Sequence, residues 1–388
     1  MMKILSKISW MFAALLLLAV GFVSCNKNED KDDDDQKEQL LEAVVDQYVN
    51  NTVITTYKSL ADGTINLYDL LVTLKDDRTD ANVKAAADAW IKTRDYWELS
   101  EAFLFGPASD FGIDPHIDTW PLAKDELLAE LANESHINSM AQEDGDEWVA
   151  NYLGAGLLGF HGIEYILFEG GQVKAAAKIT DKEMVYAVAV AGDLRNQCFR
   201  LEASWAGIDN VTAEKRDKLE ALELSTTINT SKYSYGEDML RAGEAGSTKI
   251  SFADACEDIL EGCFTIADEV GAMKIGKPYS GEDVNYIESP YSYNSKVDFI
   301  GNIKSIQNAY LGGADKNARK SALGSYIKTV DADLDSRLIA AMDNAIAKIE
   351  AIPYPFAKHY AGEETRVAME ACNELADILT EAKGALRK

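Results

Sequence analysis

The chain has 388 residues, of which 47% are hydrophobic and 27% are charged, and its formal net charge at pH 7 is −27. Nucleic-acid binding requires clustered lysine and arginine side chains that neutralise phosphates, and the sequence contains no such cluster. Nucleic acid is therefore excluded as a partner, whereas the acidic surface raises the local concentration of cations.

The first 24 residues have the features of an export signal. Lys3 and Lys7 form a short basic segment, and the apolar stretch from Trp10 to Val20 is too short to span a hydrocarbon core of about 30 Å. Small residues and Cys25 follow. Residues 1–24 are therefore predicted to be a lipoprotein signal peptide, with cleavage before Cys25 and lipidation of its thiol. An ordinary secretory signal with an incidental cysteine is the alternative. Loss of Lys3 and Lys7 would take the net charge from −27 to −29.

Residues 25–38 are predicted to be a tether, because they contain an acidic run from Glu29 to Asp35. A block of like charge without apolar residues repels itself and stays disordered. The run resembles the acidic signal that follows the lipidated cysteine in some surface lipoproteins of Gram-negative bacteria, and a solvated spacer is the alternative. We therefore expect an outer-membrane lipoprotein of a Gram-negative envelope, held to the membrane by lipid on Cys25. Exposure at the cell surface follows only from the first interpretation.

From Gln39 onward the sequence is predicted to be helical nearly throughout. Gln39 to Leu60 carries apolar residues at the 3.6-residue period of an amphipathic helix. The same period recurs over Val83–Phe105, Glu147–Phe168, Asp181–Trp205, Phe252–Met273, Val297–Leu311, Ala322–Ala351 and Glu363–Leu386. Alternating β patterns are absent from the sequence.

Two long segments of the second half are predicted to be irregular loops. Ser225 to Ser251 is rich in Gly, Ser and Thr, and Ile275 to Ser295 is rich in Gly, Pro and Tyr. About 350 residues are enough for two domains, and the pattern changes near Gly207. We therefore expect an all-α fold of two helical-bundle halves packed together, with the first at 39–207 and the second at 208–388.

A histidine and a carboxylate lie three residues apart in the most apolar of the predicted helices. His161 and Glu164 fall within Gly159–Phe168 and would share one helix face. They could bind one cation, or they could hydrogen-bond each other and only join two helices. An imidazole binds a metal only when neutral, so metal affinity should fall as the pH drops through about 6.5.

An earlier predicted helix carries charges on an aromatic face. Trp90, Arg94, Trp97 and Glu101 recur at i, i+4, i+7 and i+11, which places them in a single stripe. Arg94 and Glu101 are partly desolvated there and should seek partners. Glu98 lies beside the stripe. The pattern is compatible either with Glu98 as part of a binding site or with Glu98 on a solvated face of the helix.

These residues carry a resemblance to a family. The sequence Gly159-x-His161-x-x-Glu164 resembles the GxHxxE signature of the imelysin-like proteins, which are exported and lipid-anchored bacterial proteins. Further segments resemble that family in the same order: Trp90–Pro107, Ile117–Pro121, Glu288–Asp298 and Ile306–Gly312. The resemblance implies an all-α fold of two bundle-like halves, with the signature residues near their junction. It also adds Glu288, Ser292 and Asp298 as site candidates.

We expect His161, Glu164 and Glu101 to converge on one point, with Asp118 nearby. One imidazole with two or three carboxylates would suit a divalent metal such as Fe, Zn or Mn better than a soft metal that prefers thiolates. The resemblance to iron-associated members favours a protein that binds a metal or small ligand together with other envelope uptake proteins. A metallopeptidase is the alternative, with Glu101 or Glu288 as base and Arg94 as oxyanion stabiliser. A purely structural polar network, with binding elsewhere, is the third.

Overall fold

The computed structural model describes residues 29–228 and 231–386, and the predicted signal peptide and Cys25 lie outside this part of the chain. Of the described residues, 29–37 belong to one unit, and the chain from Glu38 onward forms a second, compact unit. Across the described residues, no helix is both long and apolar enough to span a bilayer.

The fold is all-α, as predicted. Among residues 29–228 and 231–386 the only strands are β1 (Phe168–Glu169) and β2 (Gln172–Val173), which form an antiparallel hairpin of two residues each. The apolar faces of the helices meet in a continuous buried core of Leu, Ile, Val, Ala and aromatic side chains. Burial of these faces stabilises the helices, because short helices are marginal in water on their own.

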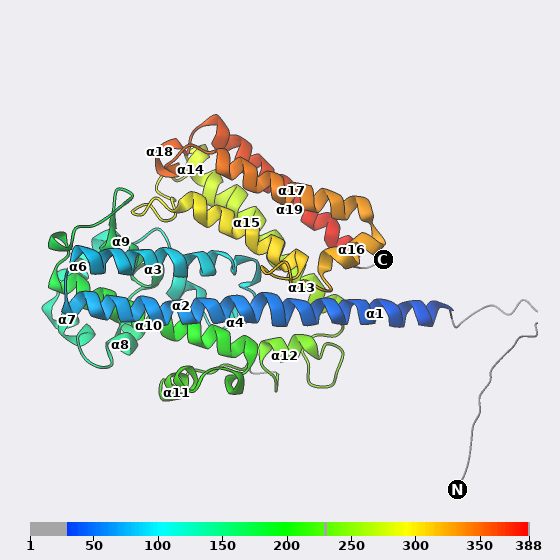
Figure 1. Ribbon diagram of the computed structural model, residues 1–388, viewed down its shortest axis with the longest axis horizontal. Helices are drawn as coiled ribbons and strands as arrows, with labels where there is room; N and C mark the ends of the chain where they lie inside the picture. The colour runs from blue at the N-terminus through cyan, green and yellow to red at the C-terminus, as the bar shows by residue number, and fades with distance from the viewer. Residues whose placement is uncertain (1–28, 229–230, 387–388) are drawn as a thin grey trace, which may run out of the picture. The chain divides into compact units, whose positions relative to one another are not determined.

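The first group of helices is built around α2 (Ile54–Asp76), α3 (Asp80–Glu98) and α10 (Asp181–Ala206), which pack side by side (Figure 1). The short α9 (Gly159–Leu167) packs against both α3 and α10. Its N-terminus requires Gly159, which has φ +68°, and a Cβ there would lie 2.0 Å from the carbonyl oxygen of Ile117. The first glycine of the GxHxxE sequence therefore fixes how α9 enters the core.

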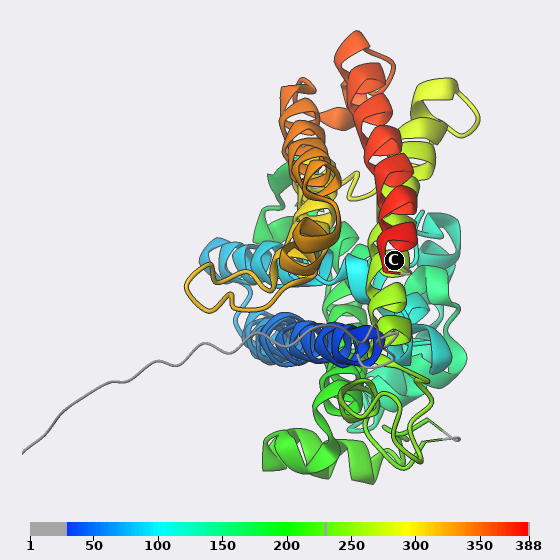
Figure 2. The same ribbon diagram turned by 90° about the vertical axis from the view of Figure 1, so that its right-hand side faces the viewer.

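The second group comprises α13 (Phe252–Asp268), α15 (Ser295–Leu311), α17 (Ala332–Ala351) and α19 (Glu363–Ala385), coloured from yellow-green to red in Figures 1 and 2. α15 contacts α3, and α13 contacts the 3₁₀ turn Glu101–Phe103. The C-terminal end of α3 and the turn after it therefore form the junction between the two groups.

The remaining elements complete the fold. They are α1 (Glu29–Gln47), the π-helical turns Tyr48–Val53 and Glu269–Ile275, the 3₁₀ turns Ala155–Leu157, Ala176–Lys178 and Ile208–Asn210, and the helices α4 (Pro107–Asp110), α5 (Asp114–Asp118), α6 (Lys124–Ala132), α7 (Glu134–Met140), α8 (Gly145–Tyr152), α11 (Ala213–Ala221), α12 (Tyr235–Leu240), α14 (Gly276–Ser280), α16 (Leu323–Val330) and α18 (Phe356–His359). α11 and α12 pack on α10. The predicted domain boundaries at residues 24, 38 and 207 stay predictions.

Three predicted helices differ from the observed ones. The helix predicted over Val83–Phe105 ends at Glu98, where the Trp97 carbonyl accepts from both the backbone N–H (2.8 Å) and the hydroxyl (2.6 Å) of Ser100, and the 3₁₀ turn Glu101–Phe103 follows. The helix predicted over Glu147–Phe168 is broken into α8, a 3₁₀ turn and α9. The helix predicted over Ala322–Ala351 is interrupted at Asp331, which caps α17 by accepting from the Leu334 amide.

α1 also differs from the prediction, because it includes the acidic run from Glu29 to Asp35 for which the sequence predicts disorder. These residues form the first two turns of the helix. Negative charge is favoured there by the unpaired backbone N–H groups and the helix dipole.

Candidate functional site

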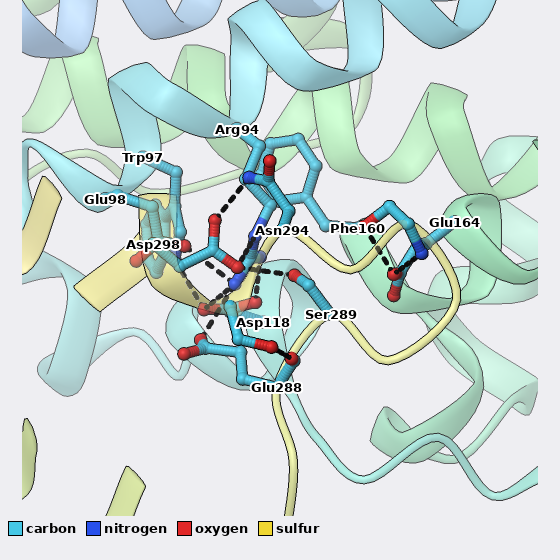
Figure 3. Close-up of polar contacts among 12 residues, drawn as sticks. Arg94, Trp97, Glu98, Asp118, Phe160, Glu164, Glu288, Ser289, Asn294 and Asp298 are labelled. Atoms are coloured by element: carbon cyan, nitrogen blue, oxygen red, sulfur yellow. Dashed lines mark hydrogen bonds and ion pairs between the residues drawn. The ribbon is translucent and has the colours of Figure 1, made fainter. Parts of the chain in front are cut away.

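Arg94 lies at the centre of a buried cluster of carboxylates (Figure 3). Its Nη2 is 2.6 Å from Glu98 Oε1 and 2.8 Å from Glu288 Oε1. Nη1 pairs with Asp118, and Nε lies 3.5 Å from Asp298 Oδ2. The sequence predicts that a desolvated Arg94 has polar partners. In the structure these partners are four carboxylates.

Both groups of helices supply this cluster. Arg94 and Glu98 lie one turn apart on α3, and Asp118 is the last residue of α5. Glu288 lies in the loop before α15, and Asp298 lies in the first turn of α15. The cluster therefore forms only when the two groups pack together.

His161 is buried between two carboxylates. Its Nδ1 lies 3.2 Å from Glu164 Oε2, and its Nε2 lies 3.1 Å from Asp118 Oδ1. Burial and the nearby Arg94 lower the pKa of His161, but the hydrogen bonds with Asp118 and Glu164 outweigh them and raise the pKa to about 9. The predicted His161–Glu164 contact on one helix face is therefore present, and the imidazole is cationic at neutral pH in the absence of metal.

Glu164 uses its second oxygen to hold a loop from the other group of helices. Glu164 Oε1 accepts hydrogen bonds from the Tyr291 amide (3.0 Å), the Ser292 amide (2.7 Å) and the Ser292 hydroxyl (2.7 Å). Two non-glycine residues of this loop, Ser289 and Tyr293, have φ of 48° and 62°, a conformation that bulky side chains rarely adopt. Glu164 therefore fixes the loop that carries Glu288.

Other hydrogen bonds complete the position of Glu288 and its neighbours. The Ser295 hydroxyl donates to the Glu288 carbonyl (2.5 Å), and the Ser289 hydroxyl donates to Asp298 (2.5 Å). Asn294 Nδ2 also donates to Asp298 (2.6 Å). The family resemblance implies Glu288, Ser292 and Asp298 as site residues. Glu288 and Asp298 contact Arg94 in the cluster, and Ser292 is connected to the cluster through Glu164.

Acidic groups outnumber basic groups in the cluster. Its side chains are at most 7% exposed, and they comprise the carboxylates Glu98, Glu101, Asp118, Glu164, Glu288 and Asp298 and the cations Arg94, Lys274 and protonated His161. Burial raises the pKa of Glu98 and Glu101 well above the usual range and that of Asp298 to about 6. Burial also acts to raise the pKa of Asp118, but Arg94 and His161 outweigh it and hold this pKa low. The excess of acid groups is relieved by bound protons or by a bound cation.

Three groups of side chains place ligand atoms within 4.8 Å of one another. They are Asp118–His161–Glu288, Glu98–Glu288–Asp298 and Glu98–Glu101–Asp118. Only the first of these groups contains an imidazole. In it, Glu288 Oε2 is buried without a hydrogen-bond partner within the described part of the chain, and the one charged contact of His161 Nε2 there is the 3.1 Å ion pair with Asp118 Oδ1. One imidazole and two carboxylates fit a divalent Fe, Mn or Zn ion.

The convergence expected from the sequence is only partly reproduced. His161 meets Glu164 and Asp118, whereas Glu101 belongs to a ligand group with Glu98 and Asp118. Glu164 belongs to none of the three groups found among residues 29–228 and 231–386. Glu288 joins His161 and Asp118 in the first group, whereas Glu164 faces the other ring nitrogen, Nδ1, through Oε2 and accepts the hydrogen bonds of the loop through Oε1.

Lys274 and Asn302 were missed by sequence reasoning. Lys274 Nζ lies 3.1 Å from Glu288 Oε1 and 3.9 Å from Glu101 Oε1. Asn302 Nδ2 donates to Glu98 Oε2 (2.6 Å). Lys274 is a charged residue among apolar neighbours in the segment that continues α13. The same pattern indicates that Arg94 needs partners, and it would also have identified Lys274.

Comparison with known proteins decides the family. The sequence profile of the imelysin family, also described as peptidase M75, matches residues 53–382. The chain belongs to the imelysin family. Iron-regulated protein A of Synechococcus elongatus is 27% identical over 322 residues, which cover 83% of this chain and 79% of that protein.

Solved structures of imelysin-family proteins share the fold. A crystal structure from Parabacteroides distasonis that carries the name of an iron-regulated protein A precursor superposes with a TM-score of 0.75 and 27% identity, covering 90% of this chain and 95% of that one. An imelysin-like protein from Psychrobacter arcticum has a TM-score of 0.58 at 15% identity, covering 90% and 94% of the two chains, and supports the fold alone. The predicted family resemblance is confirmed.

Proposed function

We propose that this imelysin-family protein is a lipid-anchored envelope protein that binds a divalent metal ion through Asp118, His161 and Glu288 and takes part in iron uptake. The observation that carries the proposal is the group Asp118–His161–Glu288, in which Glu288 Oε2 is buried without a hydrogen-bond partner among the described residues and His161 Nε2 faces only Asp118, in a cluster with excess acid groups. A cation bound there would satisfy both atoms and offset the negative charge. The homologues named for iron regulation favour iron among the metals that suit these ligands.

The contacts of Arg94 bear on how tightly a metal would be held. Arg94 already pairs with Asp118 and Glu288, so an incoming cation competes with the guanidinium for the same carboxylates. Protonated His161 must also lose its proton before Nε2 can bind. Both costs weaken binding, which suits a metal that is taken up and passed on rather than held permanently.

The metallopeptidase alternative is supported less well. A hydrolytic metal site keeps an open position for water and a free donor for the developing oxyanion. Each side-chain nitrogen of Arg94 already faces a carboxylate, and Glu288 is fully buried beside Lys274. Glu101 remains as a candidate base, but it is not in the group that contains His161. We therefore favour binding over catalysis.

Metal binding by the purified full-length protein tests the proposal. Anaerobic equilibrium dialysis against Fe²⁺, Mn²⁺ or Zn²⁺, with bound metal measured by mass spectrometry, should give one bound ion per chain. His161→Ala and Glu288→Gln should each weaken binding at least about tenfold, which corresponds to roughly 1.4 kcal/mol. His136→Ala is the matched control, because His136 pairs with Glu130 at the surface, and it should bind as wild type does.

Three outcomes separate the alternatives. Wild-type protein without bound metal, or a His161→Ala protein that binds as wild type does, would contradict the proposal. Chelator-sensitive cleavage of a peptide library by wild type but not by His161→Ala would favour the peptidase. If neither binding nor cleavage occurs and His161→Ala only lowers the free energy of unfolding, by about 1–3 kcal/mol, the cluster is a structural network.

A further inference from the structure

An acidic pocket lies beside the buried cluster. It has a volume of about 440 Å³ and is lined by Glu101, Asp114, Glu269, Glu261 and apolar groups that include Leu104 and Phe105. None of its lining residues is a lysine or an arginine. We call this pocket, defined by Glu101, Asp114 and Glu269, the acidic vestibule.

The carboxylates of the acidic vestibule have few partners of their own. Glu101 is 7% exposed and its carboxylate accepts no hydrogen bond from the described residues, and its only ion pair there is with Lys274 Nζ at 3.9 Å, too far for a hydrogen bond. The carboxylates of Asp114 and Glu269 also form no hydrogen bond or ion pair with residues 29–228 or 231–386. By contrast, Glu261 at the rim pairs with Lys383. A buried carboxylate such as Glu101 is costly unless something else, such as a cation, compensates it.

The electrostatics of the acidic vestibule favour a positive ligand. Its lining includes Glu101, Asp114, Glu261 and Glu269 and no basic residue. Ionised carboxylates gathered in one pocket repel one another, and a cation between them would relieve this repulsion.

Glu101 connects the acidic vestibule to the candidate metal ligands. It lines the pocket, and its carboxylate also lies within 4.8 Å of ligand atoms of Glu98 and Asp118. Asp118 in turn groups with His161 and Glu288 in the same way. Carboxylate oxygens therefore form a continuous series from the pocket to the buried imidazole.

We propose that the acidic vestibule is an outer site for a hydrated divalent cation and the route by which the metal reaches the buried ligands. The first part stands alone, and the second part rests on the proposed function. Six water molecules occupy roughly 180 Å³ at about 30 Å³ each, so the pocket has room for a cation with its hydration shell. Glu101, Asp114 and Glu269 are not a group with ligand atoms within 4.8 Å, so they would hold the ion through its waters.

The test uses Mn²⁺ and the full-length protein in two measurements. The loss of the free Mn²⁺ electron paramagnetic resonance signal reports total binding. The metal retained after rapid mixing and a brief chelator quench reports loading of the inner site, because its ligands Asp118, His161 and Glu288 are buried away from the chelator. The outer variant is Asp114→Asn/Glu269→Gln, which removes two charges with nearly unchanged shape. The inner variant is His161→Ala.

The matched control is Asp110→Asn/Asp268→Asn, which removes the same total charge as the outer variant. Both aspartates are exposed, and each is adjacent in the sequence to a residue that lines the pocket. The outer variant should lose the weakly bound Mn²⁺ and load the inner site at least about tenfold more slowly, because focused charge raises association rates by about 10–10³-fold. The inner-site occupancy at equilibrium should change by less than about twofold. The control should match wild type in both measurements.

The outcomes distinguish the two proposals. If the outer variant binds weak Mn²⁺ and loads at the wild-type rate, the outer site is wrong, whatever the inner site does. If His161→Ala matches wild type but the outer variant loses the weak Mn²⁺, the outer site stands while the proposed inner site and the route to it fail. Thermal melts establish that each variant is folded before its binding is compared.

Discussion

At the scale of single residues, His161 decides how the candidate metal site responds to pH. Asp118 and Glu164 face its two ring nitrogens, and both stabilise the charged imidazolium. If Nδ1 keeps its proton toward Glu164, the lone pair of Nε2 is directed to Asp118 and Glu288. Such a carboxylate partner orients a ligand histidine and raises its basicity.

The raised pKa of His161 leads to a different pH dependence from the one expected for an isolated histidine. Metal binding must displace a proton below about pH 9, so the apparent affinity should fall about tenfold per pH unit from pH 9 downward, not only below 6.5. It should fall more steeply below about pH 6, where Asp298 also protonates. Dialysis from pH 6 to 9 measures this. Constant affinity between pH 9 and 7 would contradict the prediction.

The stability of the metal-free protein should change in the opposite sense. A group whose pKa is raised from 6.5 to about 9 on folding stabilises the fold fully below pH 6.5, and this contribution is lost as the pH rises through 9. A nuclear magnetic resonance titration of the His161 ring checks the pKa directly, and the ring of the surface residue His136 is the internal comparison.

At the scale of elements, the helical period predicted the main helices and the contact within α9. It predicted that His161 and Glu164 share a face, because that depends only on a spacing of three residues. It did not predict the end of α3 at Glu98, where the backbone N–H and the hydroxyl of Ser100 both donate to the Trp97 carbonyl, because these bonds leave the apolar period unchanged. Helix boundaries are thus decided by local polar competition that periodicity does not record.

The partners of the charged side chains were predictable in kind but not in identity. Desolvation alone indicates that Arg94 and Glu101 need partners. It cannot indicate that Glu164 bonds to Ser292, which lies 128 residues away, or that Lys274 pairs with Glu288. These contacts depend on how the loop before α15 folds over α9, which only the tertiary structure defines.

The loop held by Glu164 gives the prediction at this scale. Glu164→Ala removes the acceptor of three hydrogen bonds, so the Tyr291 and Ser292 amides should exchange hydrogen faster and the free energy of unfolding should fall by about 1–3 kcal/mol. Metal affinity should also fall, because Glu288 loses its fixed position. Glu164→Gln keeps an acceptor oxygen and should change amide exchange less.

Ser292→Ala is the matched comparison, because it removes only the hydroxyl and leaves both amide bonds to Glu164. Its cost should be about 0.5–1.5 kcal/mol, with amide protection largely retained. Unchanged exchange of the loop amides in Glu164→Ala would show that other contacts, and not Glu164, hold the loop.

At the scale of the whole molecule, the candidate site depends on the packing of both groups of helices. Arg94 and Asp118 come from one group, and Glu288 and Asp298 come from the other. Each carboxylate would be an unpaired buried charge if the groups separated without water entering, so the junction and the cluster stabilise each other. Metal binding to the assembled cluster should therefore raise the melting temperature of the whole body from Glu38 onward.

The connection of this body to the membrane gives the last prediction. If Cys25 is lipidated, Cys25→Ser should move the protein from the membrane fraction to the soluble fraction, because the acyl chains supply the anchoring and no helix of the described residues spans a bilayer. Ser24→Ala is the control and should stay membrane-bound. Replacement of Asp32 to Asp35 by asparagine keeps the length of α1 and should leave lipidation intact, while lowering cleavage by protease added to whole cells. A Cys25→Ser protein that remains with the outer membrane would contradict lipid anchoring, and unchanged cleavage would make the acidic run a spacer only.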